Sequence, residues 1–413
     1  MRSASALAGS GLVALALLGP AACSSASTPG APSSGPYPSV PPDIGQIVNQ
    51  GGTLLTSPKI VTVTWTADPN EAALETFGDQ LGASAYWAQA VGEYGVGPAT
   101  SGAANHVRVP TAPPAAIEVT DLETWFSQQV LDPATSSWPA WDDQTSYVVY
   151  VPTATHLTSG GADTCQQHAS LHSEVSVGDH PVSYVFIDES CNGSLSVLDG
   201  ATSAAAHEIV EDVTNPYPYS SRAYIGFDAQ HLAWALLDGE QDDELGDTCE
   251  GLSDAVFTGP ADLPFALQRV WSNASAAAGH SPCVPQSPEP YFNVTPLAQE
   301  TLGVLVGVAQ TPATALGYEV PAGTSKTFDV SYYSDAPTGL WNLAAVEGNG
   351  VTPPDASHVT LSVARGEGAN GHQDRVTVTV DSAPDGGNAI LVTLVSSAQG
   401  HTTHYFPVLI GAY

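Results

Sequence analysis

The fold of the chain is decided by residues 199–216, which read DGATSAAAHEIVEDVTNP. The stretch has helical periodicity until Asn215-Pro216, where proline ends a helix because it lacks the backbone N–H and restricts the residue before it. On a helical wheel His207 and Glu211 lie side by side, and Glu208 lies next to them. The apolar residues gather on another side. We therefore expect a helix that buries one face and presents these three polar side chains at its border.

The pattern His207-Glu208-x-x-Glu211 matches the metal-binding helix of zinc peptidases, with glutamate in place of the second histidine. The first and fifth positions of that helix hold the metal, so His207 and Glu211 are the candidate ligands. Glu208, at the second position, is the candidate general base that activates the attacking water. Zinc accepts a carboxylate oxygen at about 2.0–2.2 Å. The same pattern also occurs on exposed helices that bind nothing, so its surroundings must support it.

Short motifs on both sides accompany the helix. They are Ala206–Pro216 itself, Ala233-Trp234, Glu244–Gly251, Tyr147–Pro152, Cys165-x-x-His168, Tyr86-Trp87 and Tyr94–Gly97. Together they resemble the secreted Exordium-like, phosphate-induced proteins and their bacterial relatives over about residues 50–255. The chain departs from that pattern at Asn215, where the relatives usually carry Asp, and at Gln166, where they carry Gly. The resemblance implies a secreted or wall-associated protein with a zincin-like α/β domain.

Glu244 and Asp247 are the candidates for the third metal ligand, because the resemblance fixes their spacing to Cys249. A disulfide at Cys249 would hold their loop rigid, which a metal ligand requires. Either carboxylate completes the set with His207 and Glu211. An oxygen-rich set would also suit calcium. Zinc is therefore the expected metal, and calcium is the alternative.

Four cysteines follow the leader segment, at Cys165, Cys191, Cys249 and Cys283. In an exported chain they predict two disulfides. We favour Cys165–Cys191 and Cys249–Cys283, because each pair falls within one local region. The competing interpretation is a zinc site, since Cys165-Gln-Gln-His168 has the spacing of zinc ligands. With the first bridge formed, His168 is expected beside the metal centre as a ligand or as a catalytic proton donor.

The composition excludes several classes of partner. The chain of 413 residues has 8 Lys and Arg against 42 Asp and Glu, a formal net charge of −34. Binding to a nucleic-acid backbone is not expected, because it needs clustered cations. Attraction of a polybasic surface to a membrane is excluded on the same ground. The scarcity of Lys and Arg is typical of a secreted protein.

Residues 1–23 are expected to be an export signal. The apolar run Leu7–Leu18 is too short to span a bilayer permanently, and Gly19–Cys23 resembles a bacterial lipobox in which Cys23 is lipidated. Pro20 stands where that motif usually has Leu, so plain secretion is the alternative. Residues 24–43, rich in Ser, Pro and Gly, predict a disordered tether. The protein is thus expected outside the cell or on its surface, with membrane contact only through Cys23.

Two domains are expected beyond the tether. Residues 44–287 alternate between strands and helices, which predicts an α/β domain. Its strands are expected at 59–65, 146–152 and 182–188, and its helices at 72–91, 120–130 and 199–213. After a Pro-rich joint, residues 290–413 predict only strands, at 327–333, 358–363, 375–380, 389–395 and 404–410. Short strands separated by turn residues favour an immunoglobulin-like β-sandwich.

Two functions remain open on this basis. The first is a metallopeptidase-like hydrolase, with zinc on His207, Glu211 and an acidic residue of 244–247, and with Glu208 as base. Its substrate would be a protein, a peptide or cell-wall material. The second is a non-catalytic cell-surface protein, in which the same residues hold a structural metal or a buried hydrogen-bond network. Its sandwich would then bind glycan or protein.

Overall fold

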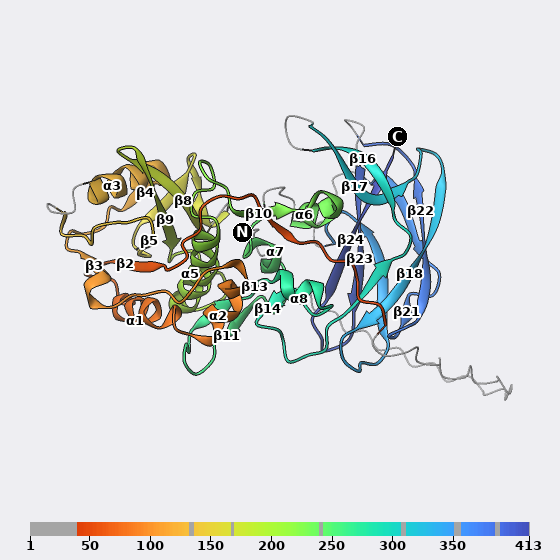
Figure 1. The fold of residues 1–413 in the computed structure, drawn as a ribbon, viewed down its shortest axis with the longest axis horizontal. Coiled ribbons are helices and arrows are strands. Elements are labelled where there is room, and N and C mark those ends of the chain that lie inside the picture. The colour runs from red at the N-terminus through yellow and green to blue at the C-terminus, as the bar shows by residue number, and fades with distance from the viewer. Residues whose placement is uncertain are drawn as a thin grey trace, which may run out of the picture.

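The computed structural model describes residues 39–131, 136–166, 169–238, 243–306, 311–350, 357–384 and 389–412. It has two parts that lie side by side (Figure 1), one of mixed helices and strands and one built of strands β15 to β24. The predicted export signal and residues 24–38 of the predicted tether lie outside the described residues. The molecule is therefore a mixed α/β protein that is rich in β-sheet.

A five-stranded sheet of order β3-β2-β5-β9-β8 forms the centre of the mixed part. Strands β2, β3, β5 and β9 run parallel, and β8 is an antiparallel edge strand. Their bounds are Lys59–Trp65, His106–Val109, Thr145–Val151, His180–Asp188 and, for β8, Ser170–Val177. The three strands expected from the sequence are confirmed. The continuous apolar run of β5 is buried along its whole length, as a strand covered on both faces should be.

Helices cover both faces of this sheet. Helices α1 (Glu71–Leu81), α2 (Ala85–Val91) and α5 (Val197–Thr214) share one apolar core with one face. Helix α3 (Val119–Leu131) packs on the other face. The segment expected as one kinked helix over 72–91 is two helices. Ser84 caps the second of them by accepting a hydrogen bond from the backbone N–H of Trp87.

Helix α5 is buried over its last four turns, from Ala201 to Thr214. It lies between the sheet and the short strand β12 (Ala266–Gln268), and Figure 1 shows α7 (Asp247–Glu250) on the side away from the sheet. The sequence placed these polar side chains at the border of the buried face, and in the structure this border is buried as well. The charged face meets β8 and α7 instead of water, because chain far away in sequence folds over it.

The mixed part also has shorter elements. They are β1 (Ile47–Asn49), β4 (Ala116–Glu118), β6 (His156–Ser159), β7 (Ala162–Asp163), β10 (Tyr224–Phe227), α6 (Leu232–Asp238), β11 (Val256–Thr258), β13 (Val270–Trp271), α8 (Asn273–Ala277) and β14 (Cys283–Val284). Disulfides join Cys165 to Cys191 and Cys249 to Cys283, so the favoured pairing is confirmed. Two such bonds are typical of an oxidising environment outside the cytoplasm.

The second part consists of two stacked sheets. Their orders are β15-β18-β22-β20 and β16-β17-β24-β23-β19-β21. The strands are Phe292–Pro296, Glu300–Val306, Thr311–Glu319, Ser325–Ser334, Trp341–Glu347, Val359–Val363, Glu367–Gly368, Gln373–Val380, Ala389–Ser397 and His404–Gly411, in the order β15 to β24. The five expected strands are confirmed, and β15, β16, β17, β19 and β21 were missed.

The two parts share an apolar core. Trp234 of α6 contacts Trp271 in its own part and Phe406 in the sandwich, with ring centroids 5.6 and 5.4 Å apart. Ser39, at the end of the predicted tether, donates a hydrogen bond from its hydroxyl to Asn370 of the sandwich at 2.9 Å. The tether prediction is therefore wrong for this last residue range, 39–43. The division into domains at 44–287 and 290–413 stays a prediction.

Within the described residues, none of the helices has both the length and the apolar character that crossing a membrane requires.

Candidate metal centre

Helix α5 brings three of the predicted site residues into one buried cluster. The side chains of His207, Glu208 and Glu211 are 4%, 6% and 3% exposed, and each offers a ligand atom within 4.8 Å of the others. Their spacing of one and four residues places them on one helix face, as the sequence indicated. The helix thus supplies three potential ligands that share one buried volume.

His207 is held on three sides. Its Nε2 lies 3.1 Å from Glu211 Oε2 and 3.3 Å from Asp247 Oδ1. Its Nδ1 lies 2.8 Å from the side-chain nitrogen of Gln268, a residue that the sequence reasoning missed. Gly246 packs against the ring so closely that an added Cβ would lie 2.6 Å from it. The imidazole is therefore fixed with Nε2 toward the carboxylates.

Glu211 is oriented by the backbone that precedes α7. Its Oε1 accepts hydrogen bonds from the N–H groups of Gly246 at 2.8 Å and Asp247 at 3.2 Å. These bonds leave Oε2 facing the two imidazoles of His207 and His172. One carboxylate oxygen is thus used for structure, and the other is directed into the cluster.

His172 of the edge strand β8 is the second imidazole of the cluster, and the sequence reasoning did not find it. Its Nδ1 lies 3.4 Å from Glu208 Oε2 and 3.6 Å from Glu211 Oε2, and its Nε2 lies 3.4 Å from Glu244 Oε1. No motif marks this histidine in the sequence. His168, which was expected here, lies outside the described residues.

The two candidates for the third ligand turn out to face different histidines. Asp247 faces His207, whereas Glu244 faces His172. Glu244 is held by Asn215, which donates a hydrogen bond from Nδ2 to Glu244 Oε1 at 2.6 Å. The backbone N–H of Ala223 in turn donates to Asn215 Oδ1 at 2.7 Å. The geometry therefore divides the acidic residues between two imidazoles.

The imidazole–carboxylate distances within the cluster are longer than the shortest such distances elsewhere in the described residues. The nearest carboxylate oxygen lies 2.7 Å from His231, 2.8 Å from His280 and 2.9 Å from His106. Such lengths are typical of charge-assisted hydrogen bonds. The five imidazole–carboxylate distances of the cluster run from 3.1 to 3.6 Å. The cluster is therefore looser than a set of direct charged hydrogen bonds.

The carboxylates control the protonation of the imidazoles. Burial alone lowers the pKa of His207, but Glu211, Asp247 and Glu208 outweigh it and raise that pKa well above its usual value. His172 behaves alike, because Glu244, Glu208 and Glu211 overcome its burial and raise its pKa. Burial raises the pKa of Glu211, and the two imidazoles reverse this and hold it far below the usual range. The cluster thus favours anionic Glu211 beside cations.

Two further carboxyls resist ionisation. Burial raises the pKa of Glu244 to about 7, although His172 opposes the shift. Burial likewise raises the pKa of Asp212, the residue after Glu211, to about 6. Asp243, next to Glu244, is buried as well, with 1% exposure. The site therefore combines an ionised Glu211 with carboxyl groups that burial holds toward their protonated form.

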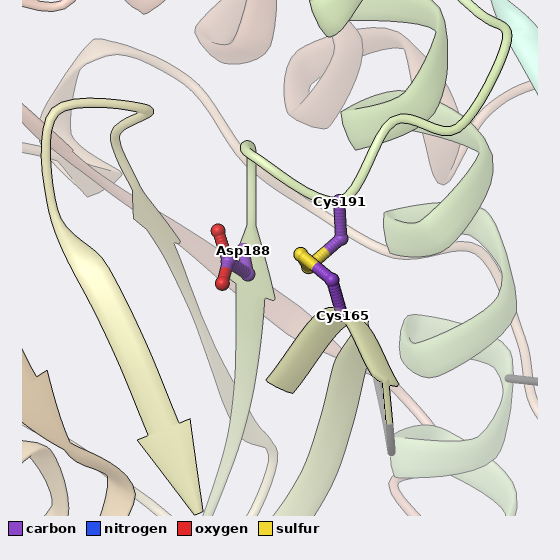
Figure 2. A group of neighbouring side chains, drawn as sticks. All are labelled: Cys165, Asp188 and Cys191. Atoms are coloured by element: carbon purple, nitrogen blue, oxygen red, sulfur yellow. A yellow bond between two sulfur atoms is a disulfide. The ribbon is translucent and has the colours of Figure 1, made fainter. Parts of the chain in front are cut away.

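The group of Cys165, Asp188 and Cys191 is a different case. Figure 2 shows the disulfide between the two cysteines beside Asp188. Both oxygens of Asp188 are engaged, since they accept hydrogen bonds from the Ser190 hydroxyl and the Thr164 hydroxyl, each at 2.7 Å. With its sulfurs bonded to each other, Cys165 is not a zinc ligand. The competing zinc interpretation of this segment is therefore wrong.

Comparisons with known proteins identify no family. No protein-family model matches the chain, and no curated protein matches it. One solved structure that matches is a Bacteroides ovatus GH5 xyloglucanase in complex with a XXXG heptasaccharide. It is 15% identical over 24% of this chain and 17% of that one, with a TM-score of 0.15. A likeness this small carries no argument, and the Exordium-like resemblance stays a prediction.

Proposed function

We propose that the protein is an exported zinc-dependent hydrolase of the metallopeptidase type. Zinc would be held by His207, Glu211 and Asp247, and Glu208 would be the general base. The observation that carries this proposal is the position of His207 Nε2, 3.1 and 3.3 Å from one oxygen of each carboxylate in a buried site. Calcium is the less suitable metal, because a nitrogen ligand lies at the centre of the set.

The two distances that His207 makes within the proposed set suit a zinc ion. Ligand atoms about 2.0–2.1 Å from a tetrahedral ion lie roughly 3.3 Å from each other. Both distances from His207 Nε2 are close to this value. Glu211 is also held in place by another group, since the Gly246 N–H donates a hydrogen bond to its Oε1. Such support from neighbouring groups is usual around metal ligands.

The chemistry of hydrolysis divides between the metal and the chain. Zinc, when bound, supplies Lewis acidity toward a carbonyl oxygen. Glu208 shares the helix face of the ligands but holds no place in the proposed set, so it is available to accept a proton from water. His172 Nδ1, 3.4 Å from Glu208 Oε2, keeps that carboxylate in place. The chain therefore offers a base next to the ligands, as peptide hydrolysis requires.

The edge of the sheet supports a peptide as substrate. Strand β8 ends the sheet on the side of His172. The His172 side chain is 4% exposed, whereas the residue as a whole is half-buried, so its accessible part is main chain. An extended peptide pairs with such an edge through backbone hydrogen bonds. A peptide bound there would pass beside the cluster.

We also propose that the first part is zincin-like and the sandwich immunoglobulin-like. The zincin-like assignment rests on the His-Glu-x-x-Glu helix behind a mixed sheet with an antiparallel edge strand. For the sandwich, β15-β18-β22-β20 corresponds to an A-B-E-D sheet, and β24-β23-β19 corresponds to G-F-C. The lipid anchor at Cys23 is a further proposal, and so are a cell-surface location and a sandwich that binds wall glycan or protein.

One observation favours the non-catalytic alternative, in which the metal is structural. The Glu208 side chain is only 6% exposed and lies against His172. A general base must reach the substrate within hydrogen-bond distance. If the cluster does not open, the metal would only hold α5, β8 and α7 together.

Metal analysis combined with two substitutions tests the proposal. Purified protein at neutral pH is expected to carry at least one zinc per chain, and His207→Ala is expected to lose it. Glu208→Gln should keep the zinc and lose hydrolysis of casein or a peptide library by more than about 100-fold. His231→Ala, a histidine with its own carboxylate on the surface, is the matched control. Zinc without any hydrolysis in the parent would leave the structural alternative, and a zinc content of His207→Ala equal to that of the parent would contradict the site.

A further inference from the structure

We propose a second divalent-metal position beside the first, held by His172, Glu244 and Glu211. This proposal rests on the proposed zinc site at His207 and extends it to a two-metal centre. The three residues come from strand β8, the segment before α7 and helix α5. Each offers one ligand atom within 4.8 Å of the other two. The set contains one imidazole and two carboxylates, a donor set that suits zinc.

The far nitrogen of His172 has no hydrogen-bond partner. Its Nε2 is fully buried and lies 3.4 Å from Glu244 Oε1 without the geometry of a hydrogen bond. Buried polar atoms in proteins are nearly always paired, because an unpaired one has lost its water without replacement. A metal ion between Nε2 and the carboxylates would satisfy this atom. The unpaired nitrogen is thus directed at the proposed position.

Metal binding requires ionised carboxylates, and the charge of the four around the imidazoles then suits more than one divalent ion. Four carboxylates lie within 3.6 Å of the two imidazoles, those of Glu208, Glu211, Glu244 and Asp247. With neutral imidazoles, one divalent ion leaves a formal charge of about −2, whereas two ions bring it to about zero. Uncompensated charge is costly in a buried site. Two ions therefore suit the cluster better than one.

Glu211 lies between the two imidazoles, on the Nδ1 side of His172, and one of its ligand atoms is within 4.8 Å of those of His172 and Glu244. Its Oε2 lies 3.1 Å from His207 Nε2 and 3.6 Å from His172 Nδ1. Glu244 is fixed toward His172 by Asn215 and does not contact His207 within ion-pair distance among the described contacts. Asp247 is correspondingly committed to His207. The arrangement gives each position its own histidine and its own acid, with one shared carboxylate, as in two-metal hydrolases.

The test counts zinc ions in the full chain without an affinity tag. Protein stripped with EDTA would be titrated with zinc chloride by calorimetry, and the bound metal measured by elemental analysis. We expect two zinc ions per chain in the parent. His172→Ala and Glu244→Gln should each bind one, and Asp247→Asn should also bind one. Glu244→Gln keeps an oxygen for Asn215, so it tests the position even if His172→Ala does not fold.

The outcomes separate this proposal from the first one. The second position alone is overturned if the parent binds one zinc that His207→Ala loses. In that case His172→Ala and Glu244→Gln bind this zinc with unchanged affinity. Loss of one of two ions on His172→Ala, with the other retained, supports it. A parent without zinc overturns both proposals. His231→Ala should bind as the parent does and excludes a general effect of removing a histidine.

Discussion

Two buried glutamates of the mixed part have opposite charge preferences. Glu211, on α5, lies among imidazoles, and its pKa is held far below the usual range by His207 and His172 against its burial. Glu189 follows β9 and faces Asp68, which follows β2. Burial together with this second carboxyl raises the pKa of Glu189 to about 9. The exposures of the two residues are nearly equal, at 2% and 1%.

The difference shows that neighbours, and not depth, decide the charge of a buried carboxyl. Glu189 has one polar contact with a neutral donor, Asn70 Nδ2, at 2.9 Å. Glu211 accepts two backbone hydrogen bonds and faces two imidazoles. A carboxylate among donors stays ionised, whereas one beside another carboxyl takes up a proton. Only the first environment can hold a cation without first losing a proton.

The largest effect is expected when Glu211 is removed. Glu211→Ala leaves the Gly246 N–H without its acceptor and leaves two buried imidazoles beside fewer carboxylates. We expect a loss of about 3–5 kcal/mol of unfolding free energy, the size seen when one partner of a buried ion pair is deleted. Bound zinc should fall to zero, because both proposed positions share this residue. Urea unfolding and elemental analysis measure the two effects, and retained zinc would contradict the shared-ligand role.

Glu189→Gln should raise the unfolding free energy, whereas Glu211→Ala lowers it. A carboxyl with a raised folded-state pKa contributes stability below its unfolded value of about 4.5, and this is lost as the pH rises toward 9. Over that window the folded state binds the extra proton, so unfolding free energy falls by about 1 kcal/mol per pH unit. Glutamine imitates the protonated form. The variant should therefore gain about 1–3 kcal/mol at pH 8.

The measurement is urea unfolding at pH 5, 6.5 and 8. Glu319→Gln, which removes an exposed carboxyl from the sandwich, is the control and should leave the pH slope unchanged. If the dependence of unfolding free energy on pH is the same in Glu189→Gln as in the parent, Glu189 is ionised in the folded state. The two glutamates would then not differ in charge.

The sequence predicted the site residues of α5 better than it predicted their surroundings. Helical spacing places His207 and Glu211 on one face whatever the tertiary structure. It did not indicate that the face is buried, because β12 and the segment before α7 cover it from more than thirty residues further along the chain. Local periodicity reports which side chains share a face, and tertiary packing decides what that face meets.

His172 and Gln268 could not be predicted as site residues, because only tertiary packing brings them to the cluster. His172 reaches the cluster only because β8 pairs with β9 in a register that sets it opposite Val185. Neither residue belongs to a spacing pattern, so no signal in a single sequence marks them. In the sandwich, β17 was missed because its Thr-, Ala- and Gly-containing segment lacks the β-branched alternation that marked β22.

A smaller effect is expected from Asn215→Asp, the change toward the residue usual in the resembled family. Aspartate keeps an acceptor for the Ala223 N–H, but it loses the donor to Glu244 Oε1 and adds a like charge at hydrogen-bond distance. We expect about 1–2 kcal/mol lower stability in the metal-free protein. Bound metal should reduce this difference, since a cation offsets the added charge. Unfolding with and without zinc measures it, and an equal loss in both states would contradict a metal position at Glu244.

The smallest effect is expected at His231, whose ion pair with Asp228 is short at 2.7 Å but lies near the surface. Burial alone lowers the pKa of His231, and Asp228 and Asp43 reverse this and raise it above 6.5. Its contribution to stability is therefore complete below pH 6.5 and is lost as the pH rises through the raised value. His231→Ala should cost no more than about 1 kcal/mol at pH 6 and less at pH 8, because water screens a pair that is partly exposed. Thermal unfolding at the two pH values checks this. A loss at pH 6 as large as that of Glu211→Ala would mean that contact distance, and not the excess of buried carboxylate, sets the strength of the imidazole pairs in this chain.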